Sequence, residues 1–275
     1  MDLGLAGAAV CILGGSKGLG RVAALEFARE GARVAVAARS RAALEETGRD
    51  LAAAGAAEVI AVPCDAANPR SIAELFARLE ARWGILHTLV NMVGPTEPSP
   101  GATFLDVPDE AWQYYWDLGV MSAVRASRAA VPLMRRAGWG RIVNVSSISA
   151  RIGMPFEAPY MAAKAALAAL SKNMAFALAP ENILVNTLTP GVYHTEALRH
   201  YMEATGASAR HDPEDPVAIY RWMVEEQGAR CAGRLGRIAR PEEIAPLILF
   251  LGSPRASYLV GANIAADGGT DFSIP

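Results

Sequence analysis

The sequence predicts one α/β domain built on a doubly wound, seven-stranded parallel sheet with helices on both faces. Short apolar segments alternate with helix-length amphipathic segments along most of the chain. Repeated strand–helix–strand order places successive strands parallel and joins them by right-handed crossovers. Because 275 residues can form one large domain, we expect residues 1–275 to form a single domain.

The expected elements follow in order along the chain. Short apolar runs predict strands at residues 8–13, 33–38, 58–62, 87–91, 141–146, 183–188 and 262–266. Apolar residues at helical spacing predict helices at residues 19–30, 42–54, 69–83, 109–136, 160–178 and 241–251. Two irregular stretches, 94–108 and about 192–237, follow strand C-termini, the edge where such sheets bind ligands. We therefore interpret 192–237 as a substrate loop or lid.

Composition favours a cytoplasmic protein with a small-molecule partner. Although 52% of the residues are hydrophobic, no apolar run reaches the roughly 20 residues of a membrane span, and no signal-peptide pattern opens the chain. The widely separated Cys11, Cys64 and Cys231 indicate reduced thiols. The net charge of −2 gives no general attraction to nucleic acid or anionic membrane. The histidines lack metal-ligand spacing, so no metal site is predicted.

A glycine-rich turn separates the first predicted strand from the first predicted helix. Glycines allow a sharp turn and close approach to a pyrophosphate, and the helix N-terminus supplies free N–H groups. A plain strand–helix turn is the alternative, but the position between strand and helix favours a Rossmann-type dinucleotide site. The candidate contacts in this turn are Gly14, Ser16, Lys17, Gly18, Leu19 and Gly20.

The end of the second predicted strand favours NADP(H) over NAD(H). NAD sites usually place an acid there for the ribose 2′-hydroxyl, whereas this chain has Arg39. Arg39 and Lys17 could pair with a 2′-phosphate, although Arg39 could also be an ordinary solvated arginine. Further along, Asp65 is either an adenine contact or a turn acid. The other candidate contacts on the adenosine side are Cys64, Asn91 and Gly94.

The most specific pattern is Tyr160 and Lys164, preceded by Ser147. Positions i and i+4 share one face of a helix. A phenol is a poor base at neutral pH, and an ammonium ~5 Å away should lower its pKa by about 2. Tyr160 is therefore a candidate acid/base. A surface lysine beside a core tyrosine is the structural alternative.

These motifs together resemble the short-chain dehydrogenase/reductase family over essentially the whole chain, with 3-oxoacyl-carrier-protein reductases as the most similar type. The resemblance implies that Ser147 holds the substrate oxygen, Tyr160 transfers the proton and Lys164 binds the nicotinamide ribose. It also implies nicotinamide contacts from Pro190, Gly191, Val192 and Thr195.

One departure from the family pattern affects the predicted catalytic group. Gly119 occupies the position of the family's asparagine, whose main-chain carbonyl holds a relay water. Glycine keeps that carbonyl and allows the helix to kink, so we expect a working but less rigid relay. Met92 and Val93 also replace residues usual in the family.

The resulting functional hypothesis is an NADP(H)-dependent oxidoreductase that interconverts a ketone and a secondary alcohol, with a bulky apolar or acyl substrate. Residues expected near the substrate are Met154, Phe156, Tyr193, His194, Met202, Tyr220, Trp222 and Met223, each of which could instead be packing, and Arg151, which could meet an acidic group or be solvated. The alternatives are a catalytically inactive nucleotide-binding subunit or sensor, and an epimerase or dehydratase. The small and apolar residues of helices 109–136 and 160–178 suit packing into a homodimer or homotetramer.

Overall fold

A computed structural model of the chain describes residues 2–95, 103–153, 157–226 and 233–271. Its parallel sheet has the strand order β3-β2-β1-β4-β5-β6-β7, which confirms the predicted doubly wound, seven-stranded fold. The strands are β1 (Ala9–Leu13), β2 (Arg33–Ala38), β3 (Glu58–Pro63), β4 (Thr88–Asn91), β5 (Gly140–Val145), β6 (Ile183–Pro190) and β7 (Asn263–Ala266). From β1 the strand order runs outward to β3 on one side, and from β4 it runs outward to β7 on the other. The crevice where such folds bind nucleotides therefore lies between β1 and β4.

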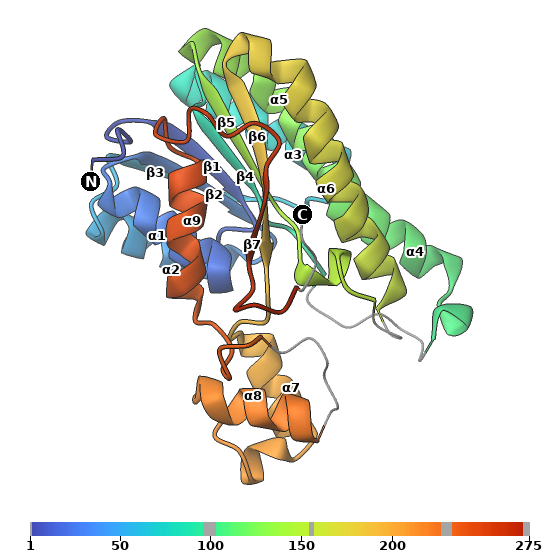
Figure 1. The fold of residues 1–275 in the computed structure, drawn as a ribbon. Coiled ribbons are helices and arrows are strands. Elements are labelled where there is room, and N and C mark those ends of the chain that lie inside the picture. The colour runs from blue at the N-terminus through green and yellow to red at the C-terminus, as the bar shows by residue number, and fades with distance from the viewer. Residues whose placement is uncertain (1, 96–102, 154–156, 227–232, 272–275) are drawn as a thin grey trace.

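Helices cover both faces of the sheet (Figure 1). One layer consists of α1 (Gly18–Arg29), α2 (Arg41–Ala53) and α9 (Pro241–Leu251), and the other of α3 (Pro69–Trp83), α5 (Ser122–Ala137) and α6 (Ala158–Leu178). Strand side chains alternate between the layers: Val10 and Ile12 join the α1 core, while Cys11 joins the α3 core. Two continuous apolar cores therefore hold the sheet rigid.

Local capping signals explain where several helices begin. The Ser40 side chain accepts from the Ala43 N–H at 3.3 Å at the start of α2, and Asn68 accepts from the Arg70 N–H at 2.9 Å at the start of α3. Proline occupies the first helical position of α3 and α9, where its missing N–H costs nothing.

The helix predicted at 109–136 is interrupted in its middle. The chain forms α4 (Asp109–Trp116), then one π-helical turn (Asp117–Met121), and then α5. The wide turn is centred on Gly119, whose lack of a side chain was expected to permit a kink. π-Bulges are frequent at functional sites, and this one lies against α6.

A helical lobe extends from the carboxyl edge of the sheet (Figure 1). It contains α7 (Glu196–Ala204) and α8 (Pro216–Glu225) and has its own small core around Met202 and Trp222. Two neighbouring segments join it to the sheet, because the Ala239 N–H donates to the Val192 carbonyl at 3.1 Å and the His194 N–H donates to the Ala239 carbonyl at 2.9 Å. The lobe corresponds to the irregular segment at 192–237, whose helices were not predicted. Cys231 lies outside the described residues.

Among the helices that the structure describes, none combines the length and hydrophobicity needed to cross a bilayer.

Candidate active site

The glycine-rich turn after β1 forms a cradle that only glycine can line. Gly14 has a φ of +93°, and a Cβ there would lie 2.8 Å from the Met92 carbonyl oxygen. A Cβ on Gly20 would lie 2.1 Å from the Gly14 carbonyl oxygen. At the start of α1, Lys17 makes no side-chain cap. The first N–H groups of α1 therefore fit a pyrophosphate, as the dinucleotide hypothesis requires.

The two cations expected at the 2′-phosphate are in different situations. Lys17 Nζ lies 3.2 Å from Glu196 Oε2, so the glycine-rich turn is bridged to the first turn of α7. Both side chains are more than half exposed, and such a pair adds little stability. Arg39 is exposed at the end of β2 and has no hydrogen bond or ion pair within the described part of the chain. Arg39 is thus the cation left open to a ligand.

The candidates on the adenosine side contribute unequally. The Cys64 side chain is buried, so only its main chain could contact a nucleotide. Asp65 Oδ1 accepts from the Ala67 N–H at 3.0 Å, so Asp65 acts as a turn acid, the second of its two predicted roles. Asn91 is buried, and its amide donates to Asn144 Oδ1 at 2.8 Å. Its other amide atom, Oδ1, has no partner among the described atoms.

Ser147, Tyr160 and Lys164 come together as expected. The Ser147 hydroxyl is hydrogen-bonded to the Tyr160 phenol, a contact that lowers the phenol pKa. Lys164 Nζ lies 5.7 Å from the centre of the Tyr160 ring. The Lys164 ammonium donates to the Val145 carbonyl at 2.9 Å and to the Val93 carbonyl at 3.4 Å. Strand ends of the sheet thus hold the lysine beneath the tyrosine.

Polar anchors that were not expected from the sequence fix α6 to the sheet. The Ser146 hydroxyl donates to the Lys164 carbonyl at 2.9 Å, and the Asn144 amide donates to Ser171 Oγ at 2.8 Å. Ser171 in turn donates to the Leu167 carbonyl at 2.7 Å. Asn144 and Ser146 belong to the same run as Ser147, and the inward face of a buried strand could have indicated them.

The electrostatic expectation for Tyr160 is corrected. Burial raises the pKa of Tyr160, and this outweighs the Ser147 hydrogen bond, while the nearby Glu157 carboxylate also raises it. Burial lowers the pKa of Lys164 to about 8. The sequence argument included the attraction between the two charges but omitted the cost of desolvating each of them. With its pKa raised above the ordinary value of a phenol, Tyr160 stays protonated at neutral pH.

Gly119 allows the π-helical turn to lie against α6. A Cβ at Gly119 would be 3.0 Å from the Cβ of Ala163, the residue before Lys164. The asparagine usual in the family could not be accommodated here without moving one of the helices. Gly119 thus sets the spacing between the π-helical turn and the helix that carries Tyr160 and Lys164.

We expect Gly119→Asn to destabilise the protein by about 1–3 kcal/mol, the usual cost of overpacking, and to lower turnover by displacing α6. Thermal unfolding and steady-state kinetics measure both effects. Adding Ala163→Gly removes the opposing Cβ and should restore part of the loss. If Gly119→Asn alone changes neither quantity, the assignment of Gly119 to the site is wrong.

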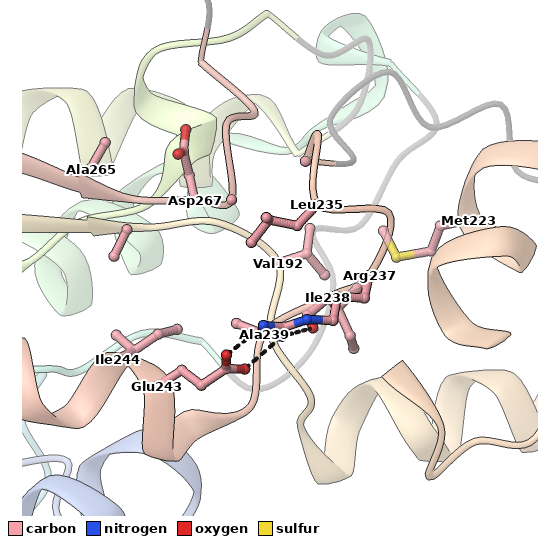
Figure 2. Close-up of a pocket in the computed structure, with 13 residues that line it drawn as sticks. Val192, Met223, Leu235, Arg237, Ile238, Ala239, Glu243, Ile244, Ala265 and Asp267 are labelled. Atoms are coloured by element: carbon pink, nitrogen blue, oxygen red, sulfur yellow. Dashed lines mark hydrogen bonds and ion pairs between the residues drawn. The ribbon is translucent and has the colours of Figure 1, made fainter. Parts of the chain in front are cut away.

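The expected nicotinamide end lies where β6 meets the lobe. A Cβ on Gly191 would be 2.7 Å from the Asp267 Cα, so glycine is required there. Thr195 Oγ1 accepts from the Leu198 N–H at 3.0 Å and caps α7. Val192 lines a cavity of about 270 Å³ with Met223, Leu235 and other residues of the lobe junction, and Figure 2 shows Arg237 paired with Glu243 at its edge. Pro190 is the buried last residue of β6.

Of the aromatic and methionine residues expected near the substrate, four belong to the core of the lobe and one, Tyr193, lies near Tyr160. Met202 and Trp222 are buried inside the lobe, so they are packing residues, and Tyr220 and Met223 lie partly buried against the same core. Tyr193 is close enough to Tyr160 to interact with it, and its pKa is raised to about 12, mainly by burial.

The remaining expected substrate neighbours do not contribute a free charged group. His194 is bonded through Nε2 to the Pro213 carbonyl at 2.9 Å. Arg151 forms an ion pair with Asp271 at 2.7 Å and is not the open cation that an acidic substrate would need. Met154 and Phe156 lie outside the described residues.

Comparison with known proteins identifies the family. A profile of the family described as "Enoyl-(Acyl carrier protein) reductase" matches residues 14–271. An uncharacterized oxidoreductase of Bacillus subtilis is 34% identical, with 98% of each chain covered. The chain belongs to the short-chain dehydrogenase/reductase family. It is an oxidoreductase acting on alcohol and carbonyl groups of a small molecule.

Two further relatives of this short-chain dehydrogenase/reductase act on sugars. The L-rhamnose 1-dehydrogenase (NAD(P)(+)) of Azotobacter vinelandii is 32% identical, over 94% of this chain and 95% of its own. The crystal structure of L-sorbose reductase from Gluconobacter frateurii, complexed with NADPH and L-sorbose, superimposes with a TM-score of 0.89 at 33% identity, covering 100% of both chains.

Proposed function

We propose that this short-chain dehydrogenase/reductase is an NADP(H)-dependent ketone reductase and secondary alcohol dehydrogenase with Tyr160 as its acid/base. The observation that carries the proposal is the cluster of Ser147, Tyr160 and Lys164 at the carboxyl edge of the sheet. It stands beside a glycine cradle fitted to a dinucleotide. An acid, an oxygen-binding hydroxyl and a cation in one cluster match the needs of carbonyl reduction.

Each residue of the cluster has a separate role in the proposed reaction. When bound, the nicotinamide supplies hydride for reduction and accepts it in oxidation. Ser147 donates a hydrogen bond to the substrate carbonyl oxygen and orients it. Tyr160 Oη transfers its proton to that oxygen as the alcohol forms, and the Lys164 ammonium stabilises the phenolate left behind. We assign to the Gly119 carbonyl the relay water through which the proton is replaced.

NADP(H) preference is proposed from Arg39 and from the absence of an acid at the end of β2. A charge-assisted hydrogen bond contributes about 1.5–3 kcal/mol, so we expect Arg39→Ala to weaken NADPH binding by roughly 10- to 100-fold. NADH affinity should stay within about twofold, because NADH has no 2′-phosphate to bind. Parallel fluorescence titrations with both cofactors measure the ratio. An equal loss for both would assign Arg39 a structural role instead.

The substrate proposal is a neutral ketone, with bulky apolar or acyl ketones as the first class and ketoses as the second. Tyr193 supports the first class, because this partly buried aromatic side chain lies near Tyr160. The second class rests on the sugars named for the L-rhamnose dehydrogenase and the L-sorbose reductase. A panel of cyclic ketones, acyl thioesters and ketoses, each tested with NADPH and with NADH, identifies substrate class and cofactor together. NADPH binding without turnover on any of them would favour the inactive-sensor alternative.

We further propose that the chain is one functional domain in which the lobe at 192–237 acts as a substrate lid. Its two-segment junction with the sheet and its separate core support movement as a unit. A homodimer or homotetramer formed through α5 and α6 and a cytoplasmic location complete the proposal. Sizing by light scattering tests the assembly.

A further inference from the structure

Arg151 connects the loop after β5 to the last described part of the chain. Its Nη1 donates to Asp271 Oδ2 at 2.7 Å, and its Nη2 donates to the Asn263 carbonyl at 3.0 Å. The side chains of Arg151 and Asp271 are 21% and 8% exposed. Water therefore screens this ion pair much less than the exposed pairs elsewhere on the protein.

Asp271 is itself held by a tight turn that follows β7. The Asp271 N–H donates to Asp267 Oδ2 at 2.7 Å, and the Gly269 N–H donates to Asp267 Oδ1 at 3.0 Å. Gly268 and Gly269 have φ values of +61° and +80°, which suit glycine. The carboxylate that receives Arg151 is therefore fixed relative to the sheet.

Arg151 and Ser147 stand at opposite ends of one short 3₁₀ turn (Ile148–Ala150). Ser147 Oγ accepts from the Ser149 N–H at 3.2 Å, and the Arg151 N–H donates to the Ile148 carbonyl at 2.9 Å. A single turn cannot absorb a shift at one end without moving the other. Holding Arg151 in place consequently holds the hydroxyl of Ser147.

We propose that Arg151 and Asp271 are positioning residues for Ser147, so that the C-terminal segment sets the geometry of the group that orients the substrate oxygen. This inference rests on the proposed role of Ser147. Misplacement of a catalytic contact by about 1 Å can cost up to roughly 10²-fold in rate, and removing one charge leaves the other buried without its partner.

Asp271→Asn tests the proposal, because it removes the charge while keeping the shape of the side chain. We expect kcat to fall roughly 10- to 100-fold, with the NADPH dissociation constant unchanged. Arg151→Ala and the double variant Arg151→Ala/Asp271→Asn should lose kcat to the same extent, because Asp271 acts on Ser147 only through its ion pair with Arg151. Without its Ser147 hydrogen bond Tyr160 has a higher pKa, so the acid limb of the alcohol-oxidation profile should move to higher pH. Arg82→Ala, which breaks the exposed pair with Glu58, is the matched control.

Hydrogen exchange of a peptide spanning residues 147–151 gives a readout that does not depend on turnover. Faster exchange in Asp271→Asn than in the parent and in Arg82→Ala supports the positioning role, even if no ketone in the panel is reduced by the parent. Unchanged exchange overturns it. If the parent reduces a ketone and Asp271→Asn shows parental kcat and pH profile, the inference fails while the proposed function stands.

Discussion

Replacing Tyr160 with phenylalanine is expected to lower the turnover of ketone reduction by roughly 10²–10⁴-fold, the usual contribution of a general acid. The variant loses only the hydroxyl that delivers the proton. The ring, which packs above Lys164, remains in place, so NADPH binding and thermal stability should stay close to those of the parent. NADPH consumption followed by absorbance measures turnover, and a fluorescence titration measures binding.

Two observations would separate this role of Tyr160 from a structural one. Tyr258→Phe removes the same hydroxyl from a side chain that is 98% exposed, and it should leave turnover unchanged. Ser147→Ala should also reduce turnover, but should add little to the loss in Tyr160→Phe, because the two hydroxyls act on one substrate oxygen. A Tyr160→Phe variant as active as the parent would rule out the proposed mechanism.

Local patterns in the sequence were sufficient to predict the sheet and the clustering of Ser147, Tyr160 and Lys164. Strands such as β2 are short apolar runs bounded by turns, the pattern expected of strands buried on both faces of a parallel sheet. The i, i+4 spacing of Tyr160 and Lys164 places both on one face of α6 by helix geometry alone. Gly14 and Gly20 were identifiable because a turn between strand and helix is a local feature.

Contacts between distant parts of the chain could not be predicted in this way. Lys17 and Glu196 are 179 residues apart, and Arg151 and Asp271 are 120 apart. Periodicity shows which face of an element is buried but not which loop meets which. For this reason Lys17 was expected at a phosphate, and Arg151 was expected either at the substrate or in solvent, whereas both form ion pairs within the chain.

Quantities that depend on burial were also beyond local reasoning. The raised pKa of Tyr160 arises from desolvation, which depends on the whole arrangement of α6, the strand ends and the lobe. The helices of the lobe were missed because each is short, nine residues in α7 and ten in α8, and because their apolar residues pack into a small separate core and not against the main sheet.

The second large effect is expected at Gly20, where Gly20→Ala should weaken NADPH binding by at least roughly 100-fold. The added Cβ would lie 2.1 Å from the Gly14 carbonyl oxygen, far inside van der Waals contact. Gly14 cannot easily move away from the added Cβ, since its N–H donates to the Ala37 carbonyl at 2.8 Å. The turn must therefore open, and the N–H groups proposed to bind the pyrophosphate lose their arrangement.

The sign of the stability change makes the Gly20→Ala test decisive. Alanine normally stabilises a helix by about 1 kcal/mol relative to glycine, so propensity alone predicts a gain at this position in α1. Overpacking predicts instead a loss of about 1–3 kcal/mol. Gly48→Ala in α2, where the new Cβ would be 3.8 Å from its nearest neighbour, is the matched control: it should gain the stability that helix propensity predicts and keep the parental NADPH affinity. Parental NADPH affinity in Gly20→Ala would mean that the cofactor does not bind at this turn, and the assignment of the glycine-rich turn as the dinucleotide site would be wrong.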